Sequence, residues 1–498
     1  MRPGLRHRTP VAQHRSPVSA ESNPASTVVI IGGGISGLAA AHRLVELSRE
    51  NRLDPEIILL EAGERLGGCI KTEQAGEYLV EAGPDSFISE KPWALKLCER
   101  LGLTSRLIST SSARQNVFVV HRGRLVALPE GFLLMAPTRL WPVIRTPLFS
   151  WSGKLRMALE PLCPRRRDTG DESLASFVRR RFGQEVLERV AQPLIGGIYA
   201  ADPENLSLAT TMPRFLEMER AHGSVVLAMR REQKRRSSRP ESGARWSIFL
   251  SLAGGMQELV DTITARLPGG AVQLGARVSG LARDEAKQSW IVTTNKEEKI
   301  EAQGVILATP AYAAAELVSA AAPELARELE AISYVSTATV SLAYREVNFP
   351  AEFDGFGLVA PAVESRKILA CTFSSRKYSG RAPQGFVLLR AFVGGAVQPT
   401  LYQQDDRQME ASVREELAAL LDIRAKPLFC RIHRHPCSMP QYHVGHLEKV
   451  RRMENHLTQL PGLQLAGNAY RGVGTADCIH SGETAAEHIW KQISAEET

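Results

Sequence analysis

Three glycines near the start of the chain constrain its fold more than any other feature of the sequence. Gly32, Gly34 and Gly37 follow the apolar run 28–31, which predicts a buried strand, and precede the run 36–48, which predicts a helix. In such a unit the first glycine permits the tight turn, the second lets a pyrophosphate approach the backbone, and the third lets helix and strand pack closely. The unit therefore predicts an α/β domain that binds a dinucleotide at the helix N-terminus.

The residues after the next predicted strand, 56–61, narrow the choice of dinucleotide. Glu61 ends that strand, where its carboxylate can accept hydrogen bonds from ribose hydroxyls. Arg65 and the pair Gly67-Gly68 follow, and they resemble the extended fingerprint of amine-oxidase-like flavoproteins rather than that of a simple NAD dehydrogenase. The arginine can pair with the pyrophosphate, the glycines let backbone approach a flavin, and the turn that begins at Gly83 is predicted to lie along the flavin. The cofactor-binding residues predicted in this half are Gly32, Gly33, Gly34, Ile35, Ser36, Gly37, Glu61, Ala62, Arg65, Gly67, Gly68, Gly83, Pro84, Asp85 and Ser86.

A second glycine-rich turn, near the other end of the sequence, is predicted to face the same cofactor. It joins a short strand, 463–465, to the last helix, which starts near Asp477. A helix N-terminus carries about half a positive charge, so it would stabilise the negative charge of a reduced flavin. The cofactor-binding residues predicted here are Gly467, Val473, Gly474, Thr475, Ala476 and Asp477.

The order of the elements predicts an α/β fold with a discontinuous Rossmann-like FAD-binding domain. A nucleotide-type unit opens the chain and a glycine-rich strand, turn and helix close it, while material of different character lies between. We therefore expect an inserted mixed-sheet substrate domain and a mainly helical lobe. The expected divisions are a disordered tail at 1–26, an FAD-binding domain at 27–91, 246–310 and 455–498, a helical lobe at 92–210, and a substrate-binding domain at 211–245 and 311–454.

Composition excludes several classes of protein. The chain has 498 residues, a net charge of +7 and seven cysteines. Because no CxxC pair occurs, a disulfide framework or a thiolate zinc site is not expected, and a reducing cytoplasm fits best. No clean apolar run of about 20 residues occurs, so no transmembrane helix is expected. The aromatic and basic stretch 141–167 is the candidate for peripheral contact with a membrane, and no nucleic-acid partner is expected.

Four stretches of the sequence together resemble one family. From about Thr27 onward the chain is similar to the oxygen-dependent protoporphyrinogen and coproporphyrinogen oxidases, and most of all to the bacterial branch that oxidises coproporphyrinogen III. The stretches that carry the resemblance are 81–91 (EAGPDSFISEK), 192–201 (QPLIGGIYAA), 438–446 (SMPQYHVGH) and 472–478 (GVGTADC). The second and third do not occur generally in amine oxidases, so the resemblance is specific to this family.

The resemblance implies a reaction and a set of substrate-binding residues. A porphyrinogen would lose six hydrogens in three two-electron steps, with FAD as the cofactor and O2 as the acceptor, to give a porphyrin and H2O2. No catalytic side chain is expected, because the flavin carries the chemistry and the protein positions the ring. The resemblance assigns Lys91 to a substrate propionate, Val359, Thr372 and Phe392 to the faces of the macrocycle, and Val278 to a backbone contact with adenine.

Other interpretations stay open at this point. A related flavin amine oxidase or carotenoid desaturase would share the cofactor but need a different substrate cage. A non-catalytic escort protein of the same fold would need no flavin, and the intact Arg65 and glycine turns argue against it. The histidines have HxH and HxxH spacings that could chelate, but apart from Cys437 no acidic or cysteine partner completes a set, so no metal is expected. These histidines are His433, His435, His443 and His446. A monomer and a homodimer are both left open.

Overall fold

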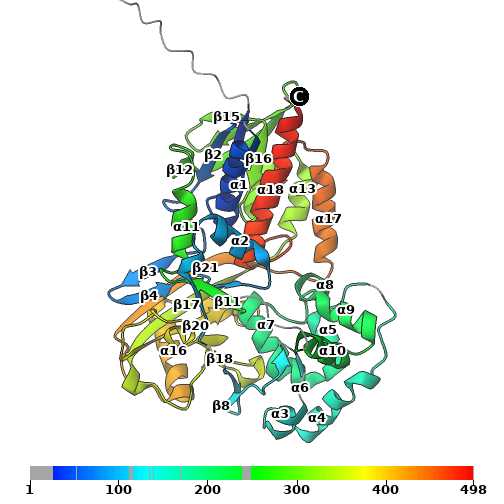
Figure 1. Cartoon of the computed structure of the whole chain (residues 1–498), viewed down its shortest axis with the longest axis vertical. Helices are drawn as coiled ribbons and strands as arrows, with labels where there is room; N and C mark the ends of the chain where they lie inside the picture. The colour runs from blue at the N-terminus through cyan, green and yellow to red at the C-terminus, as the bar shows by residue number, and fades with distance from the viewer. Residues whose placement is uncertain are drawn as a thin grey trace, which may run out of the picture.

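The computed structural model describes residues 26–496, apart from 52, 112–115, 134, 138–139, 169 and 238–247. Figure 1 shows a sheet flanked by the first and last helices, a second sheet beyond it, and a group of short helices beside the second sheet. The expected disordered tail, except for its last residue, lies outside the described residues. Within the described part of the chain, no helix combines the length and the apolar character needed to cross a bilayer.

The first sheet is parallel and joins strands that lie far apart in the sequence. Its order is β12–β2–β1–β16–β22, and β16 pairs with β1 on one side and β22 on the other. The N-terminal, middle and C-terminal parts of the chain therefore build one sheet, which confirms the expected discontinuous Rossmann-like fold. Its strands are β1 (Thr27–Ile31), β2 (Glu56–Glu61), β12 (Val272–Leu274), β16 (Gly304–Leu307) and β22 (Leu463–Leu465).

Alternate side chains of β1 enter two different cores. Val28 and Ile30 pack under α1, α11 and α18, whereas Val29 and Ile31 pack under α12, α13, α17 and a small antiparallel sheet. A strand buried on both faces is apolar throughout, which explains the apolar run that precedes the first glycine turn. The covering elements are α1 (Ile35–Asn51), α11 (Gln257–Thr264), α18 (Thr475–Glu496), α12 (Ala311–Val318), α13 (Pro323–Glu330), α17 (His446–Leu457), β13 (Val278–Asp284), β14 (Ser289–Thr294) and β15 (Lys299–Ala302).

The second sheet is mixed, as expected. Its order is β21–β17–β20–β19–β18–β7–β8, and its neighbours are antiparallel except for β18 and β7, which are parallel. One face is covered by α16, and the other lies against the helical lobe. Its elements are β7 (Val117–His121), β8 (Arg124–Ala127), β17 (Tyr334–Arg345), β18 (Gly357–Val359), β19 (Ala370–Thr372), β20 (Phe386–Gly394), β21 (Phe429–Pro440), α14 (Ser374–Lys377), α15 (Pro399–Tyr402) and α16 (Asp406–Leu421).

Short helices with a common apolar core form the helical lobe. They are α3 (Leu140–Arg145), α4 (Trp151–Ala158), η2 (Glu160–Leu162), α5 (Leu174–Phe182), α6 (Gln184–Val186), η3 (Leu187–Ala191), α7 (Gln192–Tyr199), α8 (Leu208–Thr211), α9 (Pro213–His222) and α10 (Val225–Ser237). The elements that connect the three parts are β3 (Thr72–Ala75), β4 (Tyr78–Glu81), β5 (Phe87–Ile88), α2 (Pro92–Arg100), β6 (Leu107–Ser109), β9 (Phe132–Leu133), β10 (Ala136–Pro137) and β11 (Phe249–Leu252).

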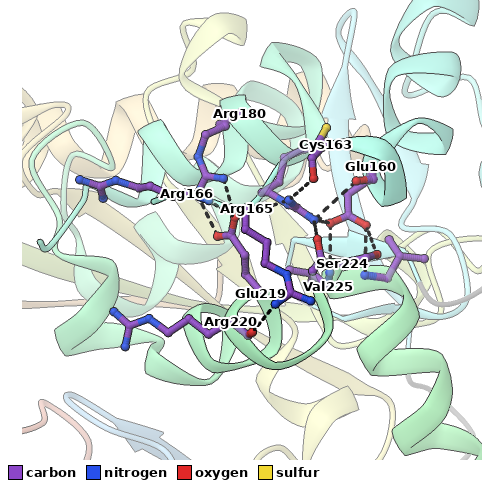
Figure 2. Close-up of polar contacts among 12 residues, drawn as sticks. Glu160, Cys163, Arg165, Arg166, Arg180, Glu219, Arg220, Ser224 and Val225 are labelled. Carbon is purple, nitrogen blue, oxygen red and sulfur yellow. Dashed lines mark hydrogen bonds and ion pairs between the residues drawn. The ribbon is translucent and has the colours of Figure 1, made fainter. Parts of the chain in front are cut away.

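A buried ion pair ties the helical lobe together, in the region shown in Figure 2. Arg181 of α5 and Glu160 of η2 are fully buried and hydrogen-bonded to each other. Glu160 also accepts hydrogen bonds from the Ser224 hydroxyl and from the backbone N–H of Val225 (3.0 Å), at the start of α10. Arg181 donates to the carbonyl oxygen of Gly223 (2.7 Å). The pair therefore fixes η2, α5 and α10 relative to one another.

Several elements lie in a different part from the one that the expected divisions give them. β7 and β8 belong to the second sheet, although they fall in the stretch 92–210 expected for the helical lobe. α9 and α10 pack in the helical lobe, and α12, α13 and α17 pack on the first sheet. The first four of these helices, and residues 446–454 of α17, fall in stretches expected for the substrate domain. Sequence patterns identify the type of an element, but packing against distant residues decides its neighbours, so these boundaries could not be read from composition.

Candidate functional site

The first glycine turn has the geometry that a phosphate-binding turn needs. Gly32 has a φ of +112°, and its N–H donates to the carbonyl oxygen of Leu60 (2.8 Å). A Cβ at Gly37 would lie 1.9 Å from the carbonyl oxygen of Gly32, whereas a Cβ at Gly34 would meet no atom within 4 Å. The turn therefore leaves open space at Gly34, directly before Ile35 begins α1, where the helix N-terminus stabilises an anion.

Glu61 lies across this turn, at the end of β2. Its carboxylate accepts hydrogen bonds from the backbone N–H groups of Gly33 (2.6 Å) and Gly63 (2.7 Å). The N–H of Ala276 donates to the carbonyl oxygen of Glu61 (2.9 Å), which brings the stretch just before Val278 to the same edge of the sheet. The structure thus gathers the residues expected for ribose and adenine beside the turn expected for the phosphates.

Arg65 makes hydrogen bonds to its own loop that the expectation did not include. Its guanidinium donates to the carbonyl oxygens of Leu66 (3.0 Å) and Ile70 (2.9 Å) and also to that of Gly68. Three of its five N–H groups therefore bind its own loop, and its contact with a pyrophosphate stays a prediction. The loop that it orders reaches the first glycine turn, because the N–H of Gly67 donates to a carbonyl oxygen of that turn (2.8 Å).

A basic cavity of about 400 Å³ lies between this loop and β21. Its lining includes Arg65 and Lys71 together with His435, and also Arg434, whose guanidinium is paired with Asp406 (2.6 Å). Burial lowers the pKa of His435, and its Nε2 lies 2.9 Å from the carbonyl oxygen of Ala82, to which the neutral ring donates. A cationic cavity beside a phosphate-binding turn suits an anionic cofactor.

The loop 81–86, called the Gly83 loop below, is held tightly in place. A Cβ at Gly83 would lie 1.9 Å from the carbonyl oxygen of Cys69, so only glycine fits. Asp85 is largely buried and pairs with Lys377 (3.0 Å) and Arg390 (3.1 Å). Burial alone would raise the pKa of Asp85, but the two cations outweigh burial and hold this pKa well below its usual range.

The second glycine turn leads into α18 and meets Lys91. Gly467 has a φ of +133°, and its N–H donates to the Ser481 hydroxyl (3.1 Å). Asp477 folds back over the turn, because a Cβ at Gly472 would lie 2.3 Å from its Cγ. The Nζ of Lys91 lies 2.7 Å from both oxygens of Asp477, and the lysine side chain is 43% exposed. The structure thus gives Lys91 a carboxylate partner within the chain, and a substrate propionate would share the ammonium group with it.

Val359, Thr372 and Phe392 lie on neighbouring strands of the second sheet. Val359 and Phe392 both pair in register with Ala370, and Thr372 lies two residues further along the same strand. Because side chains alternate along a strand, all four residues point to the same face. Val359 and Ala370 are buried in the core of the helical lobe, and Phe392 packs against it.

Sequence reasoning missed two tyrosines that join this group. Tyr199 and Tyr442 lie 6.5 Å apart between ring centres, in the same core as Val359 and Phe392. The Tyr442 hydroxyl donates to the carbonyl oxygen of Asn468 in the second glycine turn, and Val473 of that turn packs against the same core. Two of the stretches that carry the family resemblance contain these tyrosines, which is the signal that could have found them.

The histidines of the stretch 433–446 make separate contacts. His433 lies 3.1 Å from Glu73, whereas His446 lies 2.9 Å from the carbonyl oxygen of Tyr470 and stacks on Tyr442. Burial lowers the pKa of His446 to about 4, so the ring is neutral and donates to that carbonyl. Among the residues that the structure describes, no three His, Cys, Asp or Glu side chains converge as a metal site would require.

The features at the first sheet fit one class of cofactor. An open glycine turn before a helix N-terminus suits a pyrophosphate, and the Glu61 carboxylate suits a ribose. The Gly83 loop and the second glycine turn are the segments predicted to face the flavin. Adenine, ribose, pyrophosphate and an extended aromatic ring are the parts of FAD, so these residues fit that cofactor.

Comparison with known proteins gives the same result. Residues 35–490 match the family described as flavin-containing amine oxidoreductase. A coproporphyrinogen III oxidase of Bacillus subtilis is 35% identical over 465 residues, which cover 92% of this chain and 96% of that protein. Human protoporphyrinogen oxidase is 33% identical over 488 residues, which cover 93% and 98%.

A solved structure also matches nearly the whole chain. It comes from Exiguobacterium, is assigned as a protoporphyrinogen oxidase, and has a TM-score of 0.81 at 31% identity, with coverage of 93% of this chain and 98% of that one. The shared family extends over both sheets and the helical lobe, and the expected cofactor is confirmed. The chain therefore belongs to the flavin-containing amine oxidoreductase family and uses FAD.

Proposed function

We propose that the chain oxidises a porphyrinogen to the porphyrin, with coproporphyrinogen III preferred over protoporphyrinogen IX and with O2 as the electron acceptor. The observation that carries the proposal is the apolar core between the second sheet and the helical lobe, which contains Val359 and Tyr442 and lies against Phe392 and Val473. A porphyrinogen is a large disc with apolar faces, so it needs an apolar slot that opens toward the cofactor. Three bacterial relatives carry the name coproporphyrinogen III oxidase, which supports the choice of that substrate in the proposal.

In the proposed arrangement the glycine turns hold the pyrophosphate and the Gly83 loop lies along the flavin. The FAD supplies the chemistry by accepting two electrons in each of three steps. The chain's own residues bind and orient the substrate. Val359 and Phe392 pack on the faces of the macrocycle and exclude water from it. Lys91 pairs with a carboxylate at the rim, in a direction fixed by Asp477, and so selects the carbon that faces the cofactor.

A comparison of both porphyrinogens tests the proposal. The purified flavoprotein is supplied in air with coproporphyrinogen III or protoporphyrinogen IX, and porphyrin fluorescence and H2O2 are followed. We expect three H2O2 per porphyrin and a higher kcat/KM with coproporphyrinogen III. Turnover of amines or carotenoid precursors without turnover of either porphyrinogen would identify an amine oxidase or a desaturase. A folded protein that oxidises none of them would favour the escort role.

We also propose that the helical lobe contacts an anionic membrane surface. Large apolar side chains stand exposed on α3, α4 and η2, with Trp151 75% and Leu162 78% exposed, and Trp141 and Leu155 belong to the same group. Lys154 lies over the Trp151 ring, 4.7 Å from its centre. Figure 1 shows α3 and α4 together at the end of the molecule opposite the C-terminus. Aromatic rings and cationic side chains with apolar stems are favoured together at a membrane interface.

Sedimentation with lipid vesicles tests the membrane contact. We expect the protein to bind vesicles that contain phosphatidylglycerol more tightly than vesicles of phosphatidylcholine alone. Trp151→Ser and Leu162→Ser should weaken this binding. Val347→Ser is the matched control, because Val347 is 86% exposed in the short 3-10 helix Glu346–Asn348 that follows β17. Failure of the wild-type protein to bind either vesicle would refute the contact.

A further inference from the structure

One side chain of the second sheet, Arg390 of β20, reaches across to the Gly83 loop. Its Nη1 donates to the carbonyl oxygens of Gly83 (2.7 Å) and Glu81 (3.2 Å), and its Nη2 lies 3.1 Å from the carboxylate of Asp85. The guanidinium also lies over the ring of Phe392, 4.9 Å from its centre. Arg390 therefore connects the loop proposed to lie along the flavin with the strand proposed to bind the substrate.

Other side chains fix the same loop from neighbouring strands. The Thr339 hydroxyl of β17 donates to the carbonyl oxygen of Ala82 (2.8 Å), and His435 of β21 donates to the same oxygen (2.9 Å). From outside the second sheet, the Ser251 hydroxyl donates to the carbonyl oxygen of Asp85 (2.6 Å). Since β20, β17 and β21 are adjacent, the loop is bound to the second sheet through three side chains. Its position is therefore set by the substrate-binding sheet as well as by its own domain.

The group around Asp85 holds more positive than negative charge. Lys377, Arg381 and Arg390 face Asp85 and Glu81, and none of these five side chains is more than 14% exposed. Burial raises the pKa of Glu81 and lowers that of Lys377. Among these cations, Arg390 donates to the carbonyl oxygen of Gly83 itself, and solvent screens its positive charge little because the side chain is buried.

We propose that Arg390 is a positioning residue that fixes the Gly83 loop beside the FAD and, through its charge, favours the reduced form of the cofactor. Its planar fork of donors orients the loop, and a fixed positive charge stabilises a cofactor that gains negative charge on reduction. The inference rests on the placement of the flavin in the proposed function. It does not depend on which substrate is oxidised.

The reduction potential of the bound FAD tests the role of the charge. The potential is measured on the purified flavoprotein without substrate, by equilibration with redox dyes. We expect Arg390→Gln to lose at least tenfold in its preference for reduced over oxidised FAD, which is about 30 mV for a two-electron couple. Arg390→Lys keeps the charge and should keep the potential. Arg376→Gln is the matched control, because Arg376 is a largely buried arginine of α14 whose carboxylate partners are Glu346 (2.8 Å) and Asp354 (3.6 Å).

The positioning role has a readout of its own. A lysine at position 390 cannot bind two carbonyls and a carboxylate in the same fork, so both variants should change the absorbance spectrum or weaken the binding of FAD. Arg376→Gln should do neither. An unchanged spectrum and affinity would overturn the positioning role, and equal shifts of potential in Arg390→Gln and Arg390→Lys would overturn the role of charge.

Two further outcomes are separable. If Arg390→Gln does not fold, Lys377→Met removes a neighbouring positive charge and should lower the potential in the same direction, and an unchanged potential in that variant would overturn the role of charge. If the wild-type protein oxidises neither porphyrinogen but Arg390→Gln shifts the potential as expected, the proposed function fails and this inference stands.

Discussion

Removing Arg181 is expected to destabilise the helical lobe by about 3 kcal/mol. Arg181→Met takes away the guanidinium and leaves the Glu160 carboxylate buried. Breaking a buried ion pair by deleting one partner costs about 3–5 kcal/mol. The lower figure applies here because Glu160 keeps hydrogen bonds from the Ser224 hydroxyl and from the N–H groups of Val225 (3.0 Å) and Val226 (3.4 Å).

Replacing the partner residue Glu160, alone or together with Arg181, tests this expectation further. Glu160→Met leaves the Arg181 guanidinium buried, and the other carboxylate paired with it is that of Glu219, at 3.5 Å (Figure 2). The substitution also removes the acceptor at the start of α10. We expect it to cost more than Arg181→Met. The double variant, with methionine at both positions, replaces the pair by apolar groups of similar volume and should recover most of the loss.

Hydrogen exchange is the suitable assay, because a chain of several parts does not unfold in one step. A loss of about 3 kcal/mol corresponds to roughly 100-fold faster exchange of the first amides of α10. FAD content should stay unchanged, since the ion pair lies in the helical lobe. A double variant that is no more stable than Arg181→Met, or loss of FAD from either single variant, would refute the reasoning.

Three further predictions follow from the site. Lys91→Ala should retain FAD but lower kcat/KM for the porphyrinogen roughly 5- to 150-fold in steady-state assays, which corresponds to a loss of about 1–3 kcal/mol of transition-state stabilisation. Lys91→Arg should recover part of the lost kcat/KM. Wild-type kinetics in Lys91→Ala would contradict the rim contact. Gly34→Val should fold but purify without FAD, because its side chain enters the open space of the turn, whereas Gly37→Ala should lose folded yield because its Cβ would lie 1.9 Å from a carbonyl oxygen. Absorbance and circular dichroism separate the two, and a fully loaded Gly34→Val would place the cofactor elsewhere. Burial holds the pKa of His446 at about 4, below its ordinary value of 6.5. The stability that the neutral His446 ring contributes is therefore complete above pH 6.5 and is lost as the pH falls toward 4. The loss amounts to at most about 3 kcal/mol. The denaturant midpoint of His446→Gln should decline less between pH 7 and 4.5 than that of the wild-type protein. Equal declines in the two proteins would count against the role of His446 in pH-dependent stability.

The sequence predicts the cofactor turns well because their backbone geometry demands particular residues. A turn with a φ of +112° and a contact that admits no Cβ can be filled only by glycine at Gly32 and Gly37, so the spacing of the glycines records the fold directly. Strands buried on both faces are likewise recognisable from their apolar runs. The discontinuous fold could be predicted for this reason, because its two ends carry the same local signatures.

The contacts that the sequence did not predict join residues far apart in the chain. Nothing local shows that Lys91 meets Asp477, or that Arg390 reaches the carbonyl of Gly83. Arg65 shows a different limit, since an arginine in a cofactor motif can bind its own loop as well as a ligand. Such choices depend on which acceptors lie nearby in space, and only the packed structure reveals them.

The last helix, α18, covers the first helix, α1, so folding of the first sheet cannot be completed until the end of the chain has been synthesised. The turn that begins at Gly32 leaves the ribosome early, but α1 is covered by α18, where Gly482 approaches so closely that a Cβ would lie 2.1 Å from the carbonyl oxygen of Ser36. Until residues 463–496 have been made, this face of α1 is exposed apolar surface of the kind that chaperones bind. We therefore expect nascent chains to carry no flavin, and cells short of chaperones to lose this protein before its cofactor can bind.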